Sequence, residues 1–457
     1  MLMSIPLVSH RPGRSGPVVF ALVLSGLLAG CVDLPTQGQG GEPAVPLQAE
    51  KTRHFHLLDR AMVRAGGKTG GLVDEVRLVI GFRDTTVTAN KIVSRYKIVS
   101  RYEFDTVFPG MATSVHPDSL DGLLAAMLAD PDISWVEPDI PLSLIETLVN
   151  TVKGTLDLGT GLVEGLLWYR STQVTPWSMA AIGADQSWTR SGDGKGQVDV
   201  DIYILDTGAA HSDLNVVECL EFDGNTPRPC NLIDRLDLGS HGTEVAGAAA
   251  AVDDRDGIVG VAPGARIHAF NVLNELGTAE LSSIIAVIDY LTERKLARPS
   301  VPMVVNMSLG AEVGTTAYNG LDEAIRASIE AGVVYVLAAG NAGIDASTVT
   351  PAHVAEAITV GAYGEGGRFS SFSNYGPVVD LLAPGEDVET LSLGNTIIWT
   401  SGTSIAAPHV TGAVALLLAR YPSLEPRAVE RRLVRSARPI VDGVPYGTTR
   451  RSVYVGQ

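Results

Sequence analysis

The chain has 457 residues, with 51 acidic and 34 basic side chains and a formal charge of −17. This length suits two or three domains, and the acidic excess argues against nucleic-acid binding, which needs basic surface. Apolar residues make up 45% of the chain and 49 residues are glycine, which indicates a globular core with many tight turns. The three cysteines, Cys31, Cys219 and Cys230, are too few for a disulfide-rich scaffold or a four-cysteine zinc site.

Residues 1–30 are expected to be an export signal. Two arginines precede an apolar run, Val18 to Leu28, that is too short to span a bilayer. The run ends in Leu-Ala-Gly-Cys, which resembles the bacterial lipobox and implies a lipid on Cys31 that binds the chain to a membrane. The alternative is an ordinary secretory signal with a chance cysteine. Val32 after the cysteine favours the outer membrane or the cell surface.

Residues 31–73 are expected to be a flexible tether, since the stretch after the signal is rich in proline, glycine and glutamine. No later segment reaches about 18 uninterrupted apolar residues, so no membrane-spanning helix is expected.

Export delivers the chain to an oxidising compartment, which favours a disulfide between Cys219 and Cys230 over two free thiols. Closing a loop of this size contributes roughly 3 kcal/mol on a chain-entropy estimate.

Residues 74–140 have the pattern of a small α+β unit. Asp74–Phe82 is β-branched and partly alternating, which predicts a strand. Leu120–Leu128 is an apolar helical stretch that stops at an Asp-Pro-Asp turn, and Ile133–Glu137 predicts a further strand.

The hexapeptide KIVSRY occurs twice in tandem inside this unit, starting at Lys91 and at Lys97. Two copies cannot form a solenoid. We expect a local duplication in which the first copy ends a helix and the second opens a strand.

Residues 141–174 are expected to be a linker and processing region. Apolar residues recur at helical spacing in two clusters, Ile145–Val152 and Leu162–Leu167, and four glycines punctuate the segment. The segment lacks a basic face, so packing against a neighbouring domain is favoured over a membrane-surface helix.

From residue 175 to the end, apolar β-branched runs alternate with alanine-rich helical stretches. This alternation predicts an α/β domain whose parallel sheet is covered by helices on both faces. The expected strands are Val198–Leu205, Ala265–Leu273, Val301–Met307, Val333–Ala338 and Ala357–Gly361, and the expected helices are Thr243–Ala251, Leu281–Leu291, Gly320–Glu330 and His409–Arg420.

Four polar residues stand where such a sheet places its reactive groups, at strand ends and helix starts. Asp206 ends a strand and can orient a histidine, and His241 lies in a Gly-Ser-His-Gly-Thr turn at a helix start, which suits a general base. Ser404 heads an apolar helix whose first amides can bind an oxyanion, and Asn341 can add an amide donor. The alternatives are a turn aspartate, a structural histidine, a capping serine and a turn asparagine. His409 falls inside the Ser404 helix and is discounted as the base.

Taken in order, Asp, His in HGT, Asn in AAGN and Ser in GTS resemble the subtilisin-like serine peptidases, in particular the proteinase K branch. The similarity covers about 175–450. It implies a subtilisin-like fold for the catalytic domain, 175–457, and a serine endopeptidase that acts on polypeptides. It also implies that Ser404 attacks, His241 carries the proton, Asp206 orients His241, and Asn341 with the Ser404 amide holds the oxyanion.

The resemblance further implies where a substrate binds. Gly277, Thr278 and Ala279 would pair with a substrate strand. Two more stretches would line the pocket for the residue before the scissile bond, namely Ser308, Leu309 and Gly310, and Ala338, Ala339 and Gly340. For all of these small residues, tight packing and turns are the alternative.

Residues 74–140 in turn resemble the ferredoxin-like inhibitory propeptide of this family, with Val136–Asp139 where its last strand ends. The propeptide would inhibit the enzyme intramolecularly and be cut by it, and the insert before Trp177 leaves the cut site open. The lipid would then stay with the propeptide, and the catalytic domain would be released.

Three departures from the family pattern remove no catalytic group: a short loop after Asp206, Glu244 in place of a second histidine, and Ile405 after the serine. Asp380 resembles a calcium-binding carboxylate of proteinase K-like members, but calcium needs about six to eight oxygens and a surface aspartate is the alternative. The chemistry should need no cofactor, and a monomer is expected. A catalytically silent, peptide-binding protein on the same fold is the alternative function.

Overall fold

The computed structural model describes residues 75–144, 173–230, 240–274, 277–314, 320–439 and 441–456. The expected signal peptide, the lipidation at Cys31 and the tether lie outside these residues. Among the described helices, none has both the length and the apolar character that a membrane span requires.

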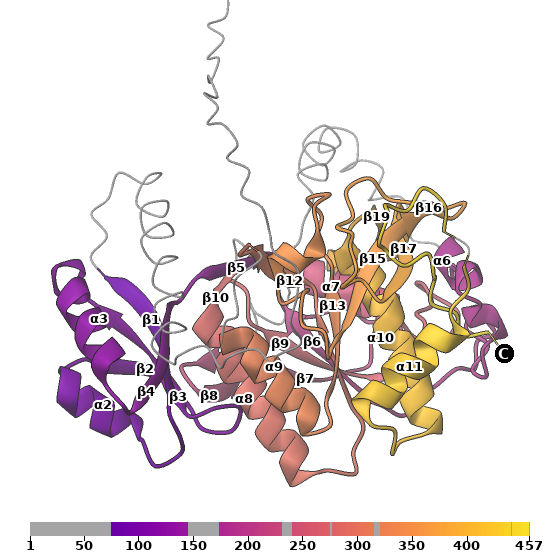
Figure 1. Ribbon diagram of the computed structural model, residues 1–457. Coiled ribbons are helices and arrows are strands. Elements are labelled where there is room, and N and C mark those ends of the chain that lie inside the picture. Colours follow the sequence, from indigo (N-terminus) through magenta and orange to yellow (C-terminus); the bar gives the residue numbers. More distant parts are fainter. Residues whose placement is uncertain are drawn as a thin grey trace, which may run out of the picture. The chain divides into compact units, whose positions relative to one another are not determined.

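The N-terminal α+β unit is a four-stranded antiparallel sheet with two helices (Figure 1). Its strand order, β2-β3-β1-β4, is the expected ferredoxin-like arrangement. Along β1, Leu78 and Ile80 pack in the unit's own core, whereas Val79 on the opposite face joins the core beneath α8 and α9 of the catalytic domain. The elements are β1 (Val76–Phe82), α2 (Ala89–Tyr96), β2 (Val99–Phe104), β3 (Gly110–Val115), α3 (Leu120–Ala129) and β4 (Ile133–Pro138).

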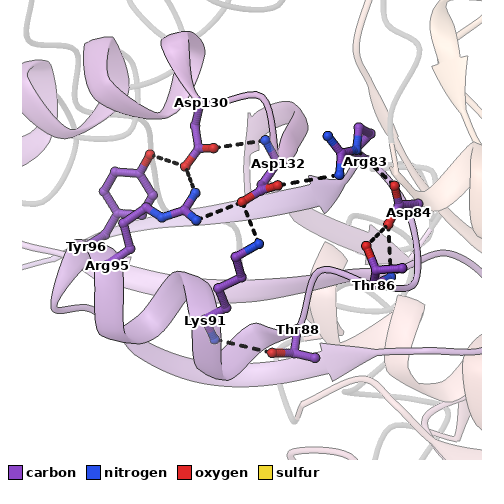
Figure 2. Close-up of polar contacts among 9 residues, drawn as sticks. All are labelled: Arg83, Asp84, Thr86, Thr88, Lys91, Arg95, Tyr96, Asp130 and Asp132. Carbon is purple, nitrogen blue, oxygen red and sulfur yellow. Dashed lines mark hydrogen bonds and ion pairs between the residues drawn. The ribbon is translucent and has the colours of Figure 1, made fainter.

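The duplicated hexapeptide takes two conformations, as expected. The first copy ends α2, where Lys91 and Arg95 bind Asp132 at 2.9 and 2.7 Å and Arg95 also binds Asp130 (Figure 2). Lys97 then adopts a left-handed conformation with φ of 56°, which ends the helix. The second copy continues into β2 and pairs with β3. Tertiary partners therefore decide between helix and strand for one and the same sequence.

The catalytic domain is built on a nine-stranded sheet with the order β16-β15-β13-β11-β6-β9-β7-β8, and β17 also pairs with β15. The central pairings are parallel, as the sequence predicts. The strands are β6 (Asp201–Asp206), β7 (Val216–Asp223), β8 (Thr226–Pro229), β9 (Arg266–Asn271), β11 (Met303–Met307), β13 (Val334–Ala338), β15 (Ile358–Gly364), β16 (Arg368–Phe369) and β17 (Leu381–Glu386).

Helices cover both faces of this sheet. Along β6, Ile202 and Ile204 pack in the core that contains α7 and α10, and Tyr203 and Leu205 pack in the core that contains α8 and α9. This alternation explains why the strand is apolar throughout. The helices are α6 (Trp177–Ala181), α7 (His241–Ala250), α8 (Leu281–Ala297), α9 (Gly320–Glu330), α10 (Thr403–Arg420) and α11 (Pro426–Ser436), and the short strands outside the main sheet are β10 (Thr278–Glu280), β12 (Leu309–Glu312), β14 (Val349–Thr350), β18 (Val388–Ser392) and β19 (Thr396–Thr400).

The first residues of the expected linker form a strand. The sequence predicts a linker from residue 141, and Pro141–Leu144 forms strand β5, which lies between β10 and β12 and is antiparallel to both. A segment of four residues is too short for its hydrophobic pattern to predict a strand. Residues 141–144 form a strand because β10 and β12 provide backbone hydrogen-bond partners on both sides. The remainder of the expected linker up to residue 172 lies outside the described residues.

The expected disulfide is present. Cys219 in β7 and Cys230, just after β8, are bonded with their Cα atoms 5.4 Å apart, and the bond closes the β7–β8 hairpin.

A buried ionic cluster lies at the start of β6, at the end of the strand opposite Asp206. His268 Nδ1 is 2.7 Å from Glu218 Oε2 and Nε2 is 3.4 Å from Asp201 Oδ1. Arg294 donates to the same Glu218 oxygen at 2.6 Å, and the imidazole stacks on Tyr203 with ring centroids 4.4 Å apart. Burial by itself would lower the pKa of His268, but the two carboxylates outweigh it and raise this pKa above its ordinary value.

Because the folded pKa of His268 is raised, its contribution to stability is complete below the ordinary histidine range and is lost as the pH rises through the folded value. We expect His268→Gln to lower the free energy of unfolding by roughly 3 kcal/mol at pH 6. This decrease in unfolding free energy should be smaller at pH 9, where a smaller fraction of His268 is charged. Urea denaturation at both pH values measures the decrease, and an equal decrease at pH 6 and pH 9 would contradict the role of the His268 charge.

Candidate active site

The first two predicted residues meet at the carboxyl end of β6. Asp206 is fully buried, and its Oδ1 and Oδ2 atoms lie 2.8 and 2.9 Å from His241 Nδ1. The Thr207 amide also donates to Oδ1 at 2.8 Å, which fixes the carboxylate. Because Nδ1 of His241 faces a carboxylate, Nε2 is the nitrogen that can take up a proton.

Residue 242, near the start of α7, must be glycine because the helix begins in close contact with the turn that follows Asp206. The Gly242 amide donates to Thr207 Oγ1 at 3.0 Å, and a Cβ on Gly242 would overlap with the carbonyl oxygen of Gly208. Ser240, directly before His241, has a left-handed φ of 58° and donates its hydroxyl to Glu244 at 2.7 Å. The small residues around His241 therefore let the helix start close enough for the histidine to reach Asp206.

Ser404 is the second residue of α10 and is buried, with 3% of its surface exposed. A Cβ on Gly402 would stand 2.7 Å from Ser404 Oγ and 3.1 Å from Asn341 Nδ2, so the hydroxyl and the amide nitrogen border the same small space. Asn341 Oδ1 accepts hydrogen bonds from Thr403 N and Thr403 Oγ1, both at 2.8 Å. These bonds fix the orientation of the amide group. Sequence reasoning missed Thr403.

A second hydrogen-bonded group contacts Ser404: its Ser308 was predicted as a pocket residue, whereas its Asn306 and Thr411 were missed. Ser308 Oγ donates to the Ser404 carbonyl oxygen at 3.0 Å and accepts from Asn306 Nδ2 at 2.9 Å. Thr411 on α10 donates to Asn306 Oδ1 at 2.8 Å, and these side chains are fully buried. The chain of bonds joins β11 to α10. The sequence feature that could have indicated this group is one asparagine in an otherwise apolar strand, because a buried amide needs hydrogen-bond partners.

His409 lies elsewhere, as expected. Its Nδ1 is 2.8 Å from the carbonyl oxygen of Ile405 within α10, and burial lowers its pKa to about 4.

The stretch predicted to pair with a substrate strand lies on one side of β5, and a stretch predicted to line the pocket lies on the other. Leu144 N donates to Gly277 O at 2.9 Å, and Thr278 and Ala279 pair with Ser143 and Leu142. On the other side, Leu309 and Gly310 pair with Leu144 and Ser143. The strand that occupies this position is therefore a segment of the same chain.

The third predicted stretch begins at the last residue of β13. Ala338 and Ala339 are buried, and Gly340 has a φ of 108° and donates its amide to Thr403 Oγ1 at 3.0 Å. A Cβ on Gly340 would overlap with the amide of Asn374. The stretch thus lies beside Asn341 and the start of α10.

Asp380 is a poor calcium ligand in this structure. One carboxylate oxygen accepts the Thr359 amide at 2.9 Å, and burial raises the pKa of Asp380 to about 7. In the part of the chain that the structure describes, no group of three or more histidine, cysteine, aspartate or glutamate side chains lies together so that it could hold a metal ion. We therefore derive no step through calcium, which stays a prediction from the resemblance.

Comparison with known proteins decides the family. Residues 197–453 match the Subtilase family model, Peptidase_S8. The chain belongs to the subtilase family. Subtilisin DY of Bacillus licheniformis is 36% identical over 280 residues, which cover 60% of this chain and 96% of that protein. The alkaline protease of Shouchella clausii is 30% identical over 348 residues, which cover 76% of this chain and 78% of that protein.

Solved structures agree on the fold of this subtilase. A cold-adapted subtilisin-like serine proteinase is 29% identical with a TM-score of 0.50, and the match covers 62% of this chain and 99% of that one. Fervidolysin from Fervidobacterium pennivorans, a keratinolytic enzyme, is 24% identical with a TM-score of 0.64, over 83% of this chain and 60% of that one. The protein is thus a subtilisin-like serine endopeptidase, and subtilases need no cofactor for catalysis.

The contact at Gly242 gives a direct test of the site's assembly. We expect Gly242→Ala to push α7 away from the Gly208 turn and to lower kcat about a hundredfold through misplacement of His241. Gly122→Ala, on α3 with open space around its Cβ position, is the matched control and should leave kcat unchanged. Hydrolysis of a chromogenic peptide measures both. Wild-type kcat in Gly242→Ala would contradict this account of the helix start.

Proposed function

We propose that this subtilase cuts polypeptides through a triad of Asp206, His241 and Ser404 with Asn341 as an oxyanion donor. Two observations carry the proposal: the buried pair of His241 Nδ1 and the Asp206 carboxylate, at 2.8 and 2.9 Å, and the small space that Ser404 Oγ and Asn341 Nδ2 both border. In this arrangement Nδ1 keeps its proton and Nε2 acts as the base.

The reaction then follows from the positions of these groups. Ser404 Oγ attacks the peptide carbonyl carbon while His241 Nε2 takes the hydroxyl proton, and Asp206 stabilises the imidazolium that forms. Asn341 Nδ2 and the first amides of α10 bind the negative oxygen of the tetrahedral intermediate. Collapse of the intermediate breaks the C–N bond, and His241 gives its proton to the departing amine. Water then cleaves the acyl-enzyme ester by the same route.

A second part of the proposal is that the protein is made as a self-inhibited zymogen. Strand β5 occupies the position of a substrate strand between β10 and β12, with backbone pairing on both sides. Leu142 of this strand is fully buried. Leu309, paired with Leu144, directly follows Ser308, which binds the Ser404 carbonyl. Residues 141–144 therefore lead the chain toward Ser404.

Two acids at the end of β4 and directly after it support the same role for the N-terminal unit. Glu137 accepts the amide of Gly320, the first residue of α9, at 2.7 Å, and Asp139 accepts the amide and hydroxyl of Ser282 in α8 at 2.9 and 2.6 Å. Carboxylates at helix N-termini satisfy amides that lack partners within the helix. Burial raises the pKa of Glu137, and neighbouring Asp322 contributes in the same direction.

Export on a lipid at Cys31 would complete this scheme. A cut after β5 would leave the lipid on the N-terminal unit and release the catalytic domain from the membrane. Fractionation of cells tests this part by itself: a catalytic fragment that stays membrane-bound without its N-terminal unit would contradict it.

The proposed nucleophile can be tested with a fluorophosphonate probe on the purified full chain. We expect the wild type to be labelled and to cut itself between residues 140 and 177, and Ser404→Ala to do neither. Wild type that is neither labelled nor cut would favour the alternative of a catalytically silent peptide-binding protein on the same fold.

The proposed oxyanion donor gives a second test. Asn341→Ala should lower kcat about a hundredfold with little change in KM, because the lost bond forms in the transition state. Thr403→Val keeps the shape of its side chain but removes the hydroxyl that binds Asn341 Oδ1, and should lower kcat by a smaller factor, roughly tenfold. Steady-state kinetics with a peptide substrate separates the two constants. A rise in KM at unchanged kcat would assign Asn341 to ground-state binding instead.

A further inference from the structure

The β7–β8 hairpin is a stiff arm at the edge of the main sheet. The Cys219–Cys230 disulfide closes its base, where Cys230 N also donates to Cys219 O at 3.0 Å. Arg228 pairs with Glu221 across the two strands at 3.2 Å. The turn is the dipeptide Gly224-Asn225, and Gly224 takes a left-handed φ of 57°, as a two-residue hairpin turn requires.

The hairpin is also fixed to the catalytic domain by its aromatic side chain. Phe222 stacks on Phe270 of β9 with centroids 5.8 Å apart and meets Tyr290 of α8 edge-on at 5.5 Å. These contacts and the disulfide leave the tip little conformational freedom, so little conformational entropy is lost when a partner binds there.

The tip binds the backbone of the N-terminal unit. Glu103 N donates to Asn225 Oδ1 at 2.9 Å, and Asn225 Nδ2 donates to Glu103 O. Glu103 belongs to β2, which is an edge strand of its sheet. An edge strand presents backbone donors and acceptors that the sheet itself does not pair. One asparagine amide thus satisfies a donor and an acceptor of the same residue, as a neighbouring strand would.

Two further contacts near the end of β2 join the N-terminal unit to the catalytic domain. Asp289 of α8 accepts the amides of Thr106 and Val107 at 2.7 and 2.8 Å. Arg101 of β2 binds Glu280 of β10 at 3.0 Å. Strand β2 and the residues after it therefore contact the catalytic domain at β10, at the hairpin tip and at α8.

We propose that the disulfide-closed hairpin is a docking arm for an edge strand, and that it keeps the N-terminal unit on the catalytic domain after the chain is cut. The retention role rests on the proposed zymogen function. The partner is the outer edge of β2, recognised through its backbone. Because the disulfide holds Asn225 in place, opening it loosens the same contact.

The docking contact is tested first in the uncut chain, which does not depend on processing. In full-length Ser404→Ala, hydrogen exchange of the Glu103 amide is followed by mass spectrometry or NMR. Asn225→Ala should speed this exchange roughly tenfold, since two hydrogen bonds are lost. Glu293→Gln is the matched control, because Glu293 lines the same cavity of about 410 Å³ between β2, the hairpin tip and α8. Unchanged exchange in Asn225→Ala would overturn the proposal.

The disulfide is tested in the same background. Replacing both cysteines with serine should speed Glu103 exchange as well, and combining this change with Asn225→Ala should add little, because both act on one contact. Fully additive effects would show that the disulfide acts elsewhere and would overturn its part in the arm.

Retention is tested in the full-length active chain. After self-cleavage, the N-terminal fragment of the wild type should co-elute with the catalytic fragment, and Asn225→Ala should shorten the lag before peptidase activity about tenfold. The kcat/KM of the released catalytic fragment should stay unchanged. An equal lag and equal co-elution in the variant would overturn the retention role. A wild type that never cuts itself would refute the zymogen proposal and the retention role with it, while the exchange experiment would still decide the docking contact.

Discussion

The four residues of β5 connect the two folded parts of the chain through backbone hydrogen bonds to β10 and β12. One strand in this place does two things. It completes a small antiparallel sheet, and its last residue, Leu144, pairs with Leu309, the neighbour of Ser308, whose hydroxyl binds the Ser404 carbonyl. Glu137 and Asp139, which directly precede it in the chain, join the N-terminal unit to the starts of α9 and α8. Inhibition and processing, as proposed, are two outcomes of this single placement.

Buried polar groups fix the positions of the residues that we propose for catalysis. Asp206, Asn306 and Ser308 are fully buried, and each has a hydrogen-bond partner that is also held by the fold. Breaking one such bond leaves a buried group unsatisfied, which costs more than the bond itself contributes. The positions of Ser404 and Asn341 are therefore set by hydrogen bonds that take no direct part in the proposed reaction.

The sequence predicts much of this because local patterns carry it. The alternation of apolar strands with alanine-rich helices gave the parallel sheet, and short motifs marked Asp206, His241, Asn341 and Ser404 at strand ends and helix starts. What it could not predict depends on partners far along the chain. Asn306 and Thr411 are 105 positions apart, and β5 is a strand because of β10 and β12. The two KIVSRY copies make the same point, since identical residues form a helix and a strand.

The measurement that tests the account most directly is the C-terminal end of the N-terminal fragment after self-cleavage, read by mass spectrometry. If residues 141–144 lie in the enzyme's own substrate site, the fragment should end within about three residues after Leu144, because each extended residue advances the chain by only about 3.3 Å. The complementary fragment should begin at the next residue. A first cut before residue 141, or one confined to the region near Trp177, would contradict the account.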